Sequence, residues 1–177
     1  QLARRVANGK LSAEAREACI AALAPANSLE QLADAGLVIE AIVENLEIKQ
    51  ALLRQLEAVC AADCILASNT SSISITRLGA GMNHPERLVG MHFFNPAPVM
   101  ALVEVIKGLA TDPNVAARVL ATALAWGKQP VLARSTPGFI VNRVARPFYA
   151  ESLRLLQEGA ADCASLDALL REAGGFA

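Results

Sequence analysis

The stretch Leu37–Asn45, which reads LVIEAIVEN, opens the part of the chain that decides the fold. It is a short apolar run that follows Gly36 and ends in polar residues, the pattern of a strand buried in a sheet. Asn45 stands at a helix N-cap position, because apolar residues then recur at helical spacing from Leu46 to Val59. The stretch therefore predicts a buried strand that leads directly into a helix.

Strands and helices continue to alternate as far as residue 133. We expect strands over residues 64–67, 88–94, 102–106 and 129–133, and helices over residues 74–80 and 112–126. Residues 2–34 have the pattern of short antiparallel helices, where Ser12 is an expected cap and Ser28 with Gln31 has capping-box spacing. This order predicts an α/β protein with a mostly parallel, doubly wound sheet.

The alternation ends at Ser135-Thr136-Pro137-Gly138. A long helix is expected from about Pro137 to Gln157, followed by a shorter one over residues 166–172. We therefore place a domain boundary near Ser135. Residues 1–134 are expected to form the α/β domain with its helical hairpin over 1–34, and residues 135–177 to begin an all-α domain.

The composition narrows the class of protein. The 177 residues are 54% hydrophobic and 19% charged, and the net charge is -1, so no basic surface for nucleic acid or an anionic membrane is expected. No apolar run is long enough to span a membrane, and no signal peptide opens the chain. Four cysteines without a C-x-x-C pair, beside two histidines, make a metal site improbable. We expect a cytoplasmic protein with reduced thiols.

Polar residues follow three of the predicted strands. The first strand runs into Glu44-Asn45, the second into Ser68-Asn69-Thr70-Ser71-Ser72, and the third passes through His92 into Asn95-Pro96. Ligands of open parallel sheets bind beyond the carboxyl ends of the strands, so these groups are expected along one edge. Helix caps and turns also account for Asn45, for the serine-rich run and for Asn95-Pro96.

His92 and Glu104 each interrupt an apolar strand. A buried histidine needs a hydrogen-bond partner, and a buried lone carboxylate is costly, so a pair of the two satisfies both. Such a carboxylate orients the imidazole and fixes its tautomer, as expected of a general acid/base. Asn142, in the next predicted helix, is either a positioning group for a ligand or part of a structural hydrogen bond.

Two chemistries fit Ser71, His92 and Glu104. Acyl transfer with Ser71 as the nucleophile is one, but no G-x-S-x-G elbow surrounds Ser71. Alcohol oxidation with His92 as the base is the other, and it requires a nicotinamide or flavin, because no side chain accepts a hydride. The spacing favours oxidation.

Four motifs resemble those of the 3-hydroxyacyl-CoA dehydrogenases. They are Ala67–Ser72 (ASNTSS), Gly90–Pro96 (GMHFFNP), Leu102–Val105 (LVEV) and Thr136–Arg143 (TPGFIVNR), and the strand Val38–Asn45 also matches. The resemblance implies a partial Rossmann-type sheet that lacks its first strands, followed by the start of the helical C-terminal domain.

The resemblance also implies roles for single residues. His92 corresponds to the catalytic base and Glu104 to its partner, while Ser71 and Asn142 correspond to the pair near the reacting oxygens of the substrate. Contacts to the NAD cofactor are implied for Glu44, Lys49, Asn69, Ser71 and Asn95. The implied reaction is the reversible oxidation of an L-3-hydroxyacyl-CoA, in fatty-acid β-oxidation or phenylacetate catabolism, by an enzyme that dimerises through its helical domain.

The chain departs from the family in several respects. No G-x-G-x-x-G turn for the cofactor pyrophosphate occurs, and Ala101 stands where the family has Lys. We therefore expect a piece truncated at both ends, inactive on its own. The segment 133–158 resembles members that act on 3-hydroxyadipyl-CoA. A non-catalytic protein like the lens crystallins of this family stays an alternative, against which the intact Ser71, His92, Glu104 and Asn142 argue.

Overall fold

The computed structural model describes residues 2–175, which are built around a five-stranded sheet. The strands lie in chain order: β1 (Leu37–Glu40), β2 (Ile65–Ser68), β3 (Leu88–Phe93), β4 (Leu102–Lys107) and β5 (Gln129–Arg134). Three neighbouring pairs are parallel, and β4 runs antiparallel to β3. The predicted mostly parallel sheet is therefore confirmed.

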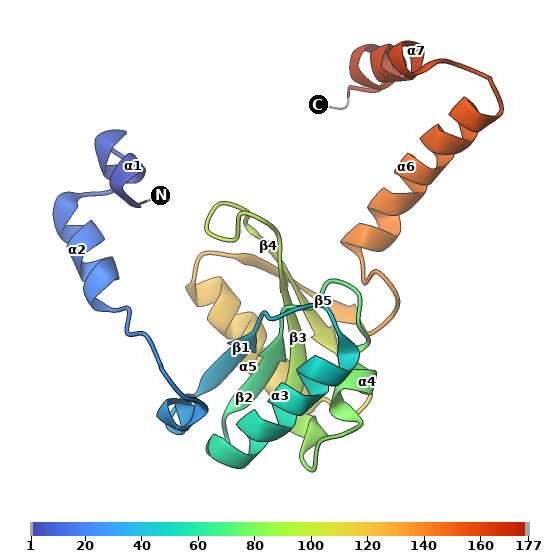
Figure 1. The fold of residues 1–177 in the computed structure, drawn as a ribbon. Helices are drawn as coiled ribbons and strands as arrows, with labels where there is room; N and C mark the ends of the chain where they lie inside the picture. Colours follow the sequence, from blue (N-terminus) through green and yellow to red (C-terminus); the bar gives the residue numbers. More distant parts are fainter. Residues whose placement is uncertain (1, 176–177) are drawn as a thin grey trace.

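Helices cover both faces of this sheet (Figure 1). Helices α3 (Leu46–Val59) and α4 (Ile75–Gly79) lie over one face, and α5 (Pro113–Ala125) lies over the other. Each face has its own apolar core, which includes Leu53, Leu66 and Ile106 on the first and Val89, Val105 and Val119 on the second. Each of these large side chains contributes roughly 1.5–3 kcal/mol by leaving water, so both faces hold the helices firmly.

Helix caps appear where the sequence predicts them, with one exception. The Asn45 side chain accepts a hydrogen bond from the amide of Ile48 at 3.0 Å, and Ser12 caps α2 in the same way. The predicted capping box at Ser28 is wrong, since the segment forms a 3-10 turn over Leu29–Leu32 without a side-chain cap. Gln31 instead reaches one residue beyond Ser28 and accepts from the Asn27 amide at 2.6 Å.

Two helical segments leave the sheet on opposite sides (Figure 1). On one side are α1 (Leu2–Ala7) and α2 (Ala13–Ala21), and on the other are α6 (Val141–Gln157), α7 (Cys163–Ala168) and a π-helical turn over Leu169–Ala173. A further 3-10 turn over Pro85–Arg87 precedes β3. Within residues 2–175, no helix has the length and apolar character needed to span a membrane.

Helix α6 begins four residues later than predicted. Gly138 and Phe139 both have left-handed backbones, with φ of 76° and 48°, and a right-handed helix cannot pass through such residues. A positive φ is costly for a side chain such as that of Phe139, which is 3% exposed. Asn142 therefore lies in the first turn of α6, not one and a half turns into it.

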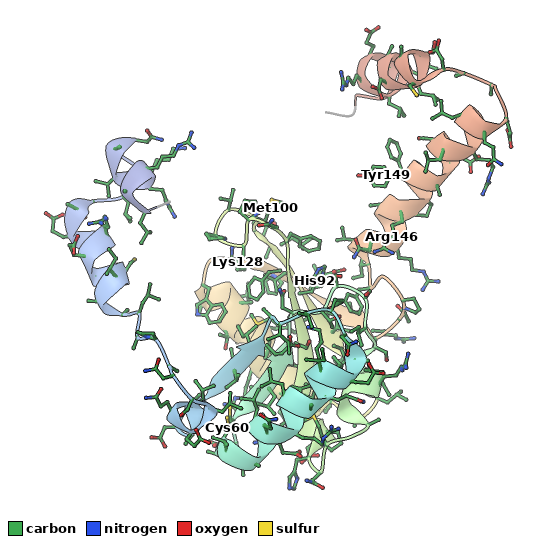
Figure 2. All side chains as sticks on the ribbon, in the orientation of Figure 1. Cys60, His92, Met100, Lys128, Arg146 and Tyr149 are labelled. Atoms are coloured by element: carbon green, nitrogen blue, oxygen red, sulfur yellow. The ribbon has the colours of Figure 1, made fainter. Side chains whose placement is uncertain are left out.

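The cysteines take no part in a metal or disulfide site among the described residues. Cys60 and Cys64 are both buried. Cys60 lies at the end of the sheet opposite His92 (Figure 2), and Cys64 directly precedes β2. Burial, and secondarily the neighbouring Cys60 thiol, raises the pKa of Cys64 to about 11, so this thiol stays protonated and packs as a small apolar group.

Candidate active site

His92 and Glu104 face each other across the antiparallel pair β3 and β4. They are register partners in the sheet, and residues in register point to the same face. His92 Nδ1 lies 2.7 Å from Glu104 Oε2, and the two residues are 6% and 0% exposed. The contact expected from two polar interruptions in apolar strands is therefore present.

The second oxygen of Glu104 is held by the start of α6. Oε1 accepts hydrogen bonds from the backbone amides of Ile140 at 2.9 Å and Val141 at 3.0 Å. A proton on Oε1 would face these two amide donors, so this oxygen serves only as an acceptor. In the neutral tautomer that donates Nδ1–H to Oε2, Nε2 of His92 keeps its lone pair.

Two aromatic rings pack against the imidazole of His92. The Phe94 ring lies 4.7 Å from it, centroid to centroid, and the Phe139 ring approaches edge-on at 5.8 Å. Phe139 was not singled out from the sequence, because its role depends on the left-handed turn before α6. These rings and the Glu104 contact fix the plane of the imidazole.

Ser71 and Asn142, the expected polar pair, lie side by side. Asn142 Nδ2 donates to the backbone carbonyl of Ser71 at 3.3 Å. The Ser71 hydroxyl instead points to Glu44 Oε1 at 3.5 Å. Within residues 2–175 no hydrogen bond joins Ser71 to His92, so the arrangement needed for a serine nucleophile is not formed.

Glu44 collects donors from the loop after β2. Its Oε1 accepts from the Thr70 hydroxyl at 2.5 Å, the Ser71 amide at 3.1 Å and the Ser72 hydroxyl at 3.2 Å. Burial by itself raises the pKa of Glu44, but these hydrogen bonds and the Lys49 ammonium outweigh it and hold the pKa below its ordinary value. Glu44 is thus a carboxylate whose side chain remains 39% exposed.

Lys49 is buried behind Glu44, with a side chain only 1% exposed. Its ammonium group donates to Glu40 Oε1 at 2.6 Å and to the Ile42 carbonyl at 3.2 Å, and lies 3.4 Å from Glu44 Oε2. Sequence reasoning missed Glu40, although it interrupts an apolar strand just as Glu104 does. Lys49 therefore reaches the exposed edge of the sheet only through Glu44.

Asn69 and Asn95 complete the polar edge. Asn69 Oδ1 accepts from the amide of Phe93 at 2.9 Å and so ties the ends of β2 and β3 together. Asn95 is exposed just beyond β3 and precedes Pro96 through a cis peptide bond. The predicted residues from β1, β2 and β3 thus share one edge of the sheet.

A cavity of about 980 Å³ lies elsewhere, at the ends of β4 and β5 beside α4. It is lined by Ser74, Lys107, Leu132 and Arg134 among others, and by none of the residues of the polar edge. We place the candidate site at His92 because His92 and Glu104 form a buried contact, whereas the charged residues that line this cavity, Lys107 and Arg134, are not buried.

The polar edge contains groups suited to a dinucleotide. Glu44 offers carboxylate oxygens that accept from ribose hydroxyls, and the Asn95 amide is exposed nearby in the same strand-end loops. Residues 1–136 match the model of the 3-hydroxyacyl-CoA dehydrogenase NAD-binding domain, and residues 138–177 match that of the C-terminal domain of the same enzymes. The chain belongs to the 3-hydroxyacyl-CoA dehydrogenase family. NAD is accordingly the cofactor of its Rossmann-like domain.

Within this family, the chain is similar to several named proteins. It is 54% identical to the 3-hydroxyadipyl-CoA dehydrogenase of Escherichia coli over 97% of the chain and 36% of that protein. It is 42% identical to a probable 3-hydroxybutyryl-CoA dehydrogenase of Bacillus subtilis, over 97% of the chain and 60% of that protein. The crystal structure of (S)-3-hydroxybutyryl-CoA dehydrogenase from Ralstonia eutropha matches with a TM-score of 0.96 at 38% identity, over 99% and 62%. The chain thus spans between about a third and three fifths of these proteins.

Proposed function

We propose that the protein oxidises L-3-hydroxyacyl-CoA to 3-oxoacyl-CoA and that residues 1–134 form most of its NAD-binding domain. Residues 135–177 then begin the helical domain. The observation that carries the proposal is the buried contact between His92 Nδ1 and Glu104 Oε2 at 2.7 Å, with the Glu104 carboxylate held by two amides of α6. A base fixed in this way beside a polar edge is suited to taking a hydroxyl proton.

In this mechanism, Nε2 of His92 accepts the proton of the 3-hydroxyl group while the C3–H bond breaks and the C3=O bond forms. Bound NAD+ supplies the acceptor for the hydride that leaves C3. The resulting imidazolium is stabilised by the Glu104 carboxylate. Asn142 lies at the start of α6 and Ser71 in the loop after β2, and we assign both to the oxygens of the substrate.

The cofactor contacts are assigned to Glu44, Asn69, Ser71 and Asn95, with Lys49 acting from behind Glu44. We further propose that the full-length protein is a cytoplasmic homodimer, joined through its helical domain. Supporting this, α6 exposes the apolar side chains of Val144, Tyr149 and Leu153, each more than 60% exposed. Tyr149 is labelled on this helix in Figure 2. The free thiols fit a reducing compartment.

The deciding experiment measures NADH formation by the purified full-length protein on 3-hydroxyadipyl-CoA and 3-hydroxybutyryl-CoA. The first is tested because the relative that is 54% identical bears its name. His92→Ala should abolish turnover, since it removes the base. Retained turnover in this variant contradicts the mechanism, and labelling of Ser71 by a fluorophosphonate would favour a serine hydrolase instead. A stable wild-type protein without turnover or labelling would favour the crystallin-like alternative.

A further inference from the structure

Glu40 belongs to a buried charge network that the proposed reaction does not use. It ends strand β1, is 3% exposed, and all of its hydrogen bonds are internal. Its Oε1 accepts from Lys49 Nζ at 2.6 Å and from the Ile42 amide at 2.7 Å, and its Oε2 accepts from the Ser68 hydroxyl at 2.6 Å. The network therefore joins β1, β2 and α3 at the polar edge.

The simplest explanation of this network is that it only stabilises the fold, but this accounts for only part of the arrangement. A buried ion pair is commonly no more stabilising than well-packed apolar residues of the same volume, because both charges lose their hydration. This pair also extends outward, since Lys49 lies 3.4 Å from Glu44 Oε2. Glu44 in turn holds Thr70, Ser71 and Ser72, which form the loop after β2.

The two distances from the ammonium group decide which carboxylate it serves. Lys49 Nζ is 2.6 Å from Glu40 and 3.4 Å from Glu44, so Glu40 is its principal counter-ion. The three groups carry one positive and two negative charges, which leaves a net negative charge on the exposed member, Glu44. Oε2 of Glu44 is thus only loosely engaged and can accept a hydrogen bond from a ligand.

We propose that Glu40 is a positioning residue of the cofactor site, which holds Lys49 back so that Glu44 stays free to accept from ribose hydroxyls of the nicotinamide dinucleotide. The inference rests on the proposed function, since it assigns Glu44 to the same cofactor. If Glu40 loses its charge, Glu44 becomes the sole counter-ion of Lys49. The ammonium then moves toward Oε2 and occupies the acceptor that the cofactor needs.

The test is a double-mutant cycle on the full-length protein, read as the NADH dissociation constant by titration calorimetry. Glu40→Gln should raise this constant about tenfold or more, the value of one hydrogen bond to a charged group. In a Glu44→Gln background the same change should have almost no effect, because Glu40 acts through Glu44. Glu47→Gln, which removes an exposed carboxylate from the first turn of α3, serves as the matched control and should leave binding unchanged.

The outcomes separate this inference from the function beneath it. Equal weakening by Glu40→Gln in both backgrounds, or no weakening at all, overturns the positioning role while the dehydrogenase proposal stands. If the wild-type protein binds no NADH, both fail together. A lower melting temperature with unchanged NADH affinity shows that Glu40 only stabilises the fold, and it also overturns the inference. Should Glu40→Gln not fold, Glu40→Asp keeps the charge but withdraws it from Lys49, and a smaller loss of affinity that again depends on Glu44 is expected; no such loss overturns the inference.

Discussion

Replacing Glu104 with Gln tests the dyad most directly, because it keeps the shape of the side chain and changes only its donors and acceptors. The carboxylate accepts from His92 Nδ1 and from the amides of Ile140 and Val141. The amide of Gln has one acceptor oxygen and one donor group, so it cannot replace all of these contacts.

The two orientations of the new amide differ in free energy. With its NH2 group toward Ile140 and Val141, two buried backbone donors lose their acceptor, at a cost of about 1–3 kcal/mol each. With its oxygen toward them, the NH2 group faces His92 and donates to Nδ1. The second orientation is therefore favoured, and it forces the imidazole into the tautomer whose Nε2 carries the proton and cannot act as a base.

The expected result is a fall in kcat of about 10²- to 10⁴-fold, the contribution of a positioned general base. The free energy of unfolding should fall by only about 0.5–3 kcal/mol, because the hydrogen bonds around this side chain are rearranged but not all lost. Initial rates of NADH formation and denaturant unfolding measure the two effects. Glu86→Gln is a matched control, since it removes the carboxylate of an exposed His84–Glu86 pair. A kcat within a few-fold of wild type would refute the reasoning.

Two further predictions concern the turn before α6 and the dependence of stability on pH in acid. Phe139→Gly and Phe139→Ala both remove the ring beside His92 and should both lower kcat, but the Gly variant should be more stable by roughly 1 kcal/mol, because glycine accepts a φ of 48°. Equal unfolding free energies for the two variants would contradict the strain argument. The second prediction concerns Glu57. Burial raises the pKa of Glu57, but hydrogen bonds from the amides of Asn83 and His84 lower it by more, so the pKa lies below its ordinary value of 4.5. The contribution of Glu57 to the free energy of unfolding is therefore complete above pH 4.5 and is lost as the pH falls through the lowered pKa. The difference in stability between wild type and Glu57→Gln should shrink in acid. A difference that grows as pH falls would contradict this sign.

The sequence predicted those features that depend on local pattern. Asn45 as a cap and the strand-helix alternation are local, and the His92–Glu104 contact follows from two polar residues that each need a partner. Glu40 carries the same signal as Glu104, a carboxylate in an apolar strand. Its partner Lys49 lies on the following helix, where a lysine looks like an ordinary surface residue.

Other features depend on contacts that no local pattern encodes. Phe139 takes a left-handed backbone directly before Ile140 and Val141, whose amides donate to Glu104, a residue far away in the chain. Asn142 meets the carbonyl of Ser71 and not its hydroxyl, since the hydroxyl is already turned toward Glu44. Which of several possible partners a side chain contacts is therefore determined only when the strands and α6 come together.

The sharing of Glu104 between His92 and α6 also bears on how the site matures during synthesis. His92 precedes Glu104 by 12 residues, so this contact becomes available as soon as the β3–β4 hairpin has left the ribosome. The amides that hold the other oxygen follow 36 and 37 residues later, after β5. A nascent chain therefore carries an incompletely held carboxylate until the first turn of α6 arrives, and the candidate base acquires its final setting among the last parts of this sheet to be completed.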